Sequence, residues 1–257
     1  MESYFGMLLV DVHAHLDLIE KEELAAVVER AAAAGVKVVI NNSIDSSSMR
    51  KSLELQQQFP LVKAALGLYP TEAGKLSAAA TEKELAFIRR SKNKVVAIGE
   101  IGLDYQEAKD EKERQLQKQL FVKQLELAKE LDKPVIVHSR KAEKDVVETL
   151  VRCGCERVVL HAFHGSMNLV KTAAAAGFYI TVPTNVQRSS HFQSIAKALP
   201  LSRLLTETDA PFLAAEKGRS SEPAHVAATV AKIAEIKGMT AEEAANVIYN
   251  NYMLLFA

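Results

Sequence analysis

The chain has 257 residues, of which 48% are hydrophobic and 25% are charged, a balance typical of one well-buried α/β domain. Its formal net charge is zero, so it lacks the basic excess usual in proteins that grip long duplex DNA, although a bound metal would add positive charge that a residue count misses. No apolar run approaches the roughly 18–20 residues of a membrane span, and the N-terminus lacks the basic and apolar regions of a signal peptide.

The chain alternates short runs rich in β-branched residues with longer amphipathic segments. Asp45 or Ser46 is placed to cap the second helix, and Thr81, with Glu84 three residues on, predicts a capping box for the third. The predicted strands are 8–15, 36–40, 61–67, 95–100, 134–138, 157–161, 178–182 and 203–209. The predicted helices are 22–34, 47–59, 81–91, 111–131, 143–153, 167–176, 191–199, 223–237 and 240–255.

Strands that are each followed by a helix, eight times in about 250 residues, match a (β/α)8 barrel. A doubly wound open sheet is the alternative, but it does not need this many repeats of the unit. No internal repeat, low-complexity segment or linker divides the sequence. We therefore expect the α/β class and a (β/α)8 TIM barrel, with residues 1–257 as a single domain.

The two cysteines, Cys153 and Cys155, are separated by one glycine. This spacing is poor for a disulfide, and two thiols make an incomplete metal site. We predict reduced thiols and a cytoplasmic protein that does not associate with membranes. No protein partner can be inferred from the sequence.

Two histidines, His13 and His15, close the first predicted strand. Alternate residues of a strand share a face, so both imidazoles would converge on one point, as in a metal site. The alternative is that one is a buried structural histidine and the other a turn residue. Four further metal-capable residues end later predicted strands, namely Glu100, His138, His161 and Asp209. Because the carboxyl ends of barrel strands form the active-site mouth, the six together favour a metal centre.

These six residues offer nitrogen and oxygen ligands only. Six ligands are too many for one tetrahedral zinc ion and fit two divalent metal ions that share a bridging carboxylate. Mg2+, Mn2+ and Zn2+ are all compatible with this ligand set. Such a pair of ions supports the hydrolysis of phosphodiesters, esters and amides.

Four sequence runs in this order resemble the TatD family of metal-dependent deoxyribonucleases. They are VDVHAHLD at 10–17, AIGEIGLDY at 97–105, VIVHSR at 135–140 and LLTETDAP at 204–211. The segments EPAHV at 222–226 and NNYMLLF at 250–256 are similar to the closing elements of the family. The resemblance therefore covers the chain from the first strand to the last helix.

The resemblance implies a barrel and hydrolysis of DNA ends, and it implies roles for individual residues. His13 and His15 would hold one metal with Asp209, and Glu100 would bridge both metals. His138 and His161 would hold the second metal. Asp209 would also accept a proton from the attacking water. Catalysis would then depend on Asp209 and Glu100, with DNA single strands or ends as the partner.

The chain departs from the family pattern at two positions near the expected site. Tyr69 stands where the family commonly has histidine, so a phosphate contact there would use its hydroxyl group. His164 stands where a small residue is common, as a substrate contact or as a partly exposed loop histidine. Arg140 is placed to meet a phosphate or to begin a solvated helix. Glu207, two residues before Asp209, is placed to orient a ligand histidine or to pair with a cation in the barrel floor.

Two other functions stay open at this point. The same metal pair suits an ester or amide substrate, such as the linkage of a D-aminoacyl-tRNA, which is an activity of TatD-like relatives. Neutral net charge and Tyr69 favour this alternative. A scaffold protein that uses the ligands only for folding is the third possibility, but structural sites are usually closed and need fewer ligands.

Overall fold

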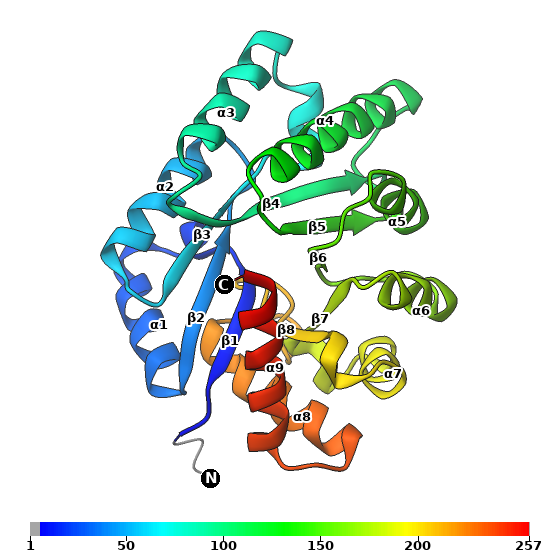
Figure 1. Cartoon of the computed structure of the whole chain (residues 1–257). Helices are drawn as coiled ribbons and strands as arrows, with labels where there is room; N and C mark the ends of the chain where they lie inside the picture. The colour runs from blue at the N-terminus through cyan, green and yellow to red at the C-terminus, as the bar shows by residue number, and fades with distance from the viewer. Residues whose placement is uncertain (1–5, 257) are drawn as a thin grey trace.

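The computed structural model describes residues 6–256. Residues 1–5 and 257, which the single-domain prediction includes, lie outside this range. Eight parallel strands pair in chain order, and the helices surround them (Figure 1). This arrangement confirms the predicted (β/α)8 barrel. The strands are β1 (Leu9–Ala14), β2 (Val36–Asn42), β3 (Val62–Leu66), β4 (Val95–Asp104), β5 (Val135–Arg140), β6 (Val158–Leu160), β7 (Tyr179–Pro183) and β8 (Leu204–Glu207).

The sheet closes on itself through the chain that follows β8. The backbone N–H of Asp209 donates to the carbonyl of His13 at 2.8 Å, and the N–H of His15 donates to the carbonyl of Ala210 at 2.7 Å. Both bonds lie just beyond the carboxyl end of β8. Closure therefore brings the end of the first strand and the segment after the last strand to the same place.

An α-helix follows each strand, and a further helix, α9, packs against α8 and the first and last strands. The strands are buried along almost their whole length, because the barrel interior covers one face and the helices cover the other. Within residues 6–256 no helix is long and apolar enough to cross a membrane. The helices are α1 (Lys21–Ala33), α2 (Ser46–Gln58), α3 (Ala78–Arg90), α4 (Glu111–Glu130), α5 (Glu143–Arg152), α6 (Met167–Ala175), α7 (Ser190–Ala198), α8 (Val226–Lys237) and α9 (Ala241–Phe256).

Of the two helix caps predicted from the sequence, one is confirmed and one is wrong. Asp45 caps α2 and accepts a hydrogen bond from the backbone of Ser48, as predicted. The cap predicted at Thr81 is wrong, because Ser77 caps α3 and the helix begins at residue 78. Glu84, which was expected to complete a capping box, instead pairs with Arg50 of α2. An earlier serine thus uses the same capping chemistry one turn before the expected start.

Strand β4 extends beyond its predicted end. We expected it to end at Glu100, whereas it runs on to Asp104. Glu100 therefore lies within the strand and not at its end, and the strand carries a second carboxylate at its true end. Cys153 and Cys155 are free thiols, as predicted.

Candidate metal centre

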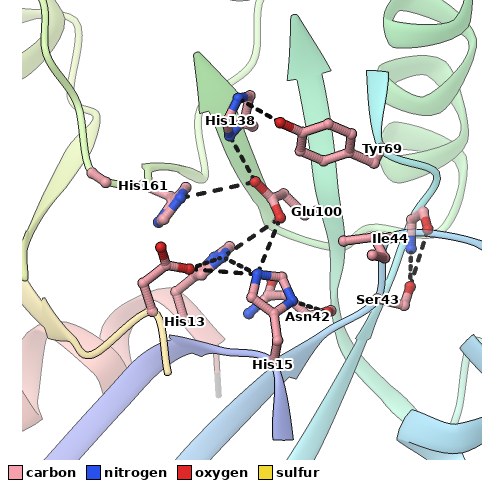
Figure 2. Close-up of polar contacts among 12 residues, drawn as sticks. His13, His15, Asn42, Ser43, Ile44, Tyr69, Glu100, His138 and His161 are labelled. Carbon is pink, nitrogen blue, oxygen red and sulfur yellow. Dashed lines mark hydrogen bonds and ion pairs between the residues drawn. The ribbon is translucent and has the colours of Figure 1, made fainter. Parts of the chain in front are cut away.

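The six residues predicted as ligands come together at the carboxyl end of the barrel. Figure 2 shows the imidazoles of His13, His15, His138 and His161 turned toward the carboxylate of Glu100. Asp209 reaches the same place from the segment after β8, within 3.5 Å of two of these rings. The side chains come from five different strands or the residues that directly follow them. Barrel closure, rather than proximity in the sequence, assembles the group.

Irregular pairing in two strands aims the side chains of this group. Between two paired positions, β1 advances by three residues, from Asp11 to Ala14, while β2 advances by only two. Likewise, β4 advances by three residues, from Ile98 to Ile101, while β5 advances by two. An extra residue in one strand bends it and redirects the local side chains. One bulge contains His13 and the other contains Glu100.

Gly102 lets β4 approach β5 beside Glu100. Its φ of +142° is a conformation that side-chain-bearing residues rarely adopt, and a Cβ atom there would overlap the backbone of His138. Gly102 also pairs in register with His138. The glycine therefore permits the short distance of 2.8 Å between Oε1 of Glu100 and Nδ1 of His138.

One cluster of ligand atoms surrounds Nε2 of His13. This atom lies 3.1 Å from Nε2 of His15, 3.6 Å from Oε2 of Glu100 and 3.5 Å from Oδ1 of Asp209. The ring of His15 lies at 3.5 Å and 3.4 Å from the same two carboxylate oxygens. All four side chains are almost completely buried. Nε2 of His13 and Nε2 of His15 thus each lie 3.4–3.6 Å from one oxygen of both carboxylates.

A second cluster forms on the other oxygen of Glu100. Its Oε1 lies 2.8 Å from Nδ1 of His138 and 3.8 Å from Nε2 of His161. The ring of His161 also stacks on that of His13, with centroids 3.6 Å apart. Glu100 therefore offers one oxygen to each cluster, which is the geometry of a bridging carboxylate.

Hydrogen bonds on the outer side of the His15 and His161 rings determine which nitrogen carries the proton. Nδ1 of His15 donates to the carbonyl of Asn42 at 2.9 Å. Nδ1 of His161 donates to Oε2 of Glu207 at 2.9 Å. In a neutral ring the other nitrogen then presents a lone pair, and in both residues that nitrogen faces the clusters. The predicted orienting role of Glu207 agrees with this contact.

Asp104 contacts the candidate site and is absent from the residues predicted from the sequence. Its Oδ2 accepts a hydrogen bond from the Tyr69 hydroxyl at 2.6 Å and lies 3.3 Å from Nε2 of His138. The Tyr69 oxygen is itself 3.0 Å from the same nitrogen (Figure 2). Two oxygens therefore hold the outer proton of His138 and leave Nδ1 to face Glu100. The available signal was spacing, since residues 100, 102 and 104 alternate along one strand face.

The chemistry of these atoms fits divalent cations. Ligands about 2.1 Å from a tetrahedral ion stand roughly 3.4 Å from one another, close to the separations measured around His13 Nε2. Two imidazoles and two carboxylates gathered in a buried site are nitrogen and oxygen ligands of the kind that divalent cations bind. The buried clusters are therefore consistent with a binuclear metal site.

Charges in the clusters shift the pKa values of the ligands away from their ordinary values. Burial alone would lower the pKa of His15, but the hydrogen bond to Asp209 and the charge of Glu100 outweigh burial and raise it to about 9. Burial alone would also lower the pKa of His161, but Glu207 and other carboxylates outweigh burial and raise it to about 10. Burial would raise the pKa of Glu100, but the surrounding imidazoles hold it well below its ordinary value.

These shifts predict how divalent-ion affinity depends on pH. An imidazole must lose its proton before it binds a metal. Because their pKa values are raised, His15 and His161 keep this proton to a higher pH than ordinary histidines do. Apparent affinity should therefore keep rising from about pH 6 to about pH 9 instead of levelling near 6.5. Calorimetric titration of Mn2+ or Zn2+ in buffers of different ionisation enthalpy measures both affinity and released protons. A constant affinity above about pH 7 would contradict the prediction.

Glu207→Gln is expected to weaken binding at the second cluster by about 10- to 100-fold. Both oxygens of Glu207 accept N–H groups, one from His161 and one from the backbone of Ala162 at 3.1 Å. A glutamine satisfies only one of these donors, so either the ring or the backbone loses its partner. Metal titration together with activity measures the change. Unaltered affinity would show that Glu207 does not orient His161.

A cavity of about 910 Å³ opens over the two clusters. All three residues predicted to contact substrate, Tyr69, Arg140 and His164, line it. Within residues 6–256 the guanidinium of Arg140 has no ion-pair partner, and neither has the neighbouring Lys141. Nδ1 of His164 donates to the carbonyl of Ala162 at 2.7 Å, and burial lowers the pKa of His164, so its other nitrogen is a hydrogen-bond acceptor.

Comparison with known proteins places this site in a family context. The family model described as TatD related DNase matches residues 10–257. The chain is 36% identical over 258 residues to the uncharacterized metal-dependent hydrolase YabD of Bacillus subtilis (strain 168), covering 97% of this chain and 99% of that protein. It is 32% identical over 261 residues to the deoxyribonuclease TATDN3 of Homo sapiens, covering 98% and 95% of the two chains.

A solved structure supports the same relationship. The crystal structure of YjjV, a TatD homologue from Escherichia coli K12, superposes with a TM-score of 0.88 at 32% identity, and the match covers 96% of this chain and 97% of that chain. The likeness therefore includes the complete barrel and every strand that carries a candidate ligand.

Proposed function

Because this chain belongs to the TatD-related DNase family of metal-dependent hydrolases, we propose that it hydrolyses phosphodiester bonds of DNA, beginning at a strand end. The observation that carries the proposal is the carboxylate of Glu100, which offers one oxygen to each of two ligand clusters. Two divalent ions, when bound, would make a water nucleophilic at neutral pH and neutralise developing charge on a phosphate.

We assign the ligands as the clusters divide them. His13, His15 and Asp209 would hold one ion, His138 and His161 would hold the other, and Glu100 would hold both. Mg2+, Mn2+ and Zn2+ all suit this mixture of imidazole and carboxylate. Asn42, Glu207 and the Tyr69–Asp104 pair keep three of the imidazoles in the orientation and tautomer that a ligand needs.

Other roles fall to side chains that line the cavity. Asp209 lies between the first cluster and the cavity, where its carboxylate would take the proton of the attacking water. The unpaired guanidinium of Arg140 would hold a phosphate group of the strand. His164 would accept a hydrogen bond from the substrate through its free nitrogen. Tyr69 already donates to Asp104, so its contact with substrate would use the oxygen as an acceptor.

The test is cleavage of an end-labelled single strand with Mg2+, Mn2+ or Zn2+ added and with EDTA. We expect shortened products that appear only with a divalent ion, and elemental analysis should find about two ions per chain. Labelling the two ends separately reports the polarity. An absence of cleavage with every divalent ion would refute the proposal.

A second candidate is hydrolysis of an ester such as the linkage in a D-aminoacyl-tRNA. The apolar residues Leu18, Ile44 and Leu213 on the cavity wall favour it, because they offer a surface to an amino-acid side chain. Parallel assays of deacylation and DNA cleavage on one preparation separate the two functions.

We also propose a cytoplasmic location, which rests on the prediction that both cysteines are reduced thiols. Fractionation of cells tests this location.

A further inference from the structure

Phe212 is an exposed aromatic side chain beside the candidate metal centre. Phe212 is 52% exposed. Among the large apolar residues that are exposed within residues 6–256, it is the only aromatic residue. Leu18, which is 46% exposed, lines the same cavity. Exposed apolar surface inside a polar, charged cavity is a feature of ligand sites.

Backbone hydrogen bonds anchor the chain on either side of the peptide bond between Pro211 and Phe212. The N–H of Phe212 donates to the carbonyl of Asp209 at 2.6 Å, and the carbonyl of the preceding Pro211 accepts from Ser221 at 2.9 Å. Its ring lies 6.2 Å from the ring of His15, at an angle of 68°. One edge of the aromatic platform therefore borders a candidate metal ligand, and part of the ring is open to solvent.

The cavity wall across from Phe212 carries the free cations. Phe212 follows β8, whereas Arg140 ends β5 and Lys141 follows it, so three strand positions separate them around the barrel. Five of the six candidate metal ligands, all except His13, line the same cavity. An aromatic platform and a cation on two sides of a reaction centre match a nucleotide, which has a flat base and a charged phosphate.

We propose that Phe212, together with Leu18 of the same cavity, is the stacking platform for one unpaired nucleobase next to the bond that is cleaved, while Arg140 receives a phosphate of the same strand. This inference rests on the proposed function and assigns a specificity-determining residue to it. A base inside a duplex has both faces covered by its neighbours, so the platform selects single strands and frayed ends. Base identity matters little, since every base has a flat π face.

The test compares Phe212→Ala and Phe212→Trp on two labelled single strands with the metal-loaded protein. One strand is natural, and the other has abasic sites at the terminal nucleotides. Phe212→Ala should lower kcat/KM on the natural strand by about ten-fold or more and leave the abasic strand unchanged, whereas Phe212→Trp should restore the value. Leu254→Ala on α9, which removes a 69% exposed side chain away from the cavity, is the matched control.

Binding gives a readout independent of hydrolysis. Fluorescence anisotropy with a strand protected by phosphorothioate linkages should show weaker binding for Phe212→Ala and normal binding for Phe212→Trp. Equal losses on natural and abasic strands, or unchanged binding of Phe212→Ala, would overturn the platform. Absence of cleavage by the wild-type protein together with base-dependent binding would instead refute the proposed function and leave the platform standing. A wild-type protein that does not bind the natural strand would overturn the platform.

Discussion

Glu100→Gln is expected to abolish metal-dependent hydrolysis, with kcat/KM at least about 1,000-fold lower, which corresponds to roughly 4 kcal/mol of transition-state stabilisation. The carboxylate offers an oxygen to each cluster, 3.6 Å from Nε2 of His13 on one side and 2.8 Å from Nδ1 of His138 on the other. A glutamine keeps the shape but presents N–H groups to one of the clusters. Metal content should fall by at least one ion per chain, as elemental analysis measures.

Glu84→Gln is the matched control for Glu100→Gln. Glu84 is also a buried glutamate, but it pairs with Arg50 on the outer helices, away from the barrel mouth. We expect this substitution to lower thermal stability and to leave metal content and kcat/KM unchanged. Normal metal content in Glu100→Gln would contradict the bridging assignment, whatever the activity.

Asp209→Asn is expected to reduce kcat/KM by about 1,000-fold through two combined losses. The substitution removes the negative charge that lies 3.5 Å from His13 Nε2 and 3.4 Å from His15 Nε2, and it removes the proposed proton acceptor. Asparagine is the informative replacement because Asp209 has a φ of +53°, which asparagine tolerates better than most residues.

The chain contains a matched control for this variant as well. Asp132 has the same φ of +53° but lies in the turn between α4 and β5, where its exposed carboxylate pairs with Arg157. Asp132→Asn should change stability by less than about 1 kcal/mol and leave activity intact. If both variants lost activity equally, backbone strain rather than the Asp209 carboxylate would be responsible.

The barrel and the six candidate ligands were predictable because their signals are local. Most strands are short apolar runs rich in β-branched residues, and most helices show apolar spacing with a capping residue or a glycine at one end. Four of the seven histidines follow such runs directly or end them. Once a repeating strand–helix unit is recognised, parallel strands place all of their carboxyl ends at one mouth, so residues far apart in sequence meet there.

The end of β4 and the role of Asp104 were not predictable in the same way. Glycines at 99 and 102 indicate the end of a strand when only the sequence is read, because glycine weakens isolated strands. In the barrel these glycines instead allow β4 to pack against β5, and hydrogen bonds to β5 carry the strand on to Asp104. Pairing with a neighbouring strand, which is a long-range interaction, overrides the local preference.

The sequence by itself determined the class of fold, the strand order expected of a repeating unit and the identity of the six convergent side chains. Only the tertiary structure decided how these six divide into two clusters, which oxygen of Glu100 faces each, and which nitrogen of each oriented ring is free. It also decided that Phe212 borders the cavity across from Arg140. The physical reason is that bulges, barrel closure and hydrogen bonds from distant residues set the direction of each side chain, whereas alternation along a strand specifies only the face.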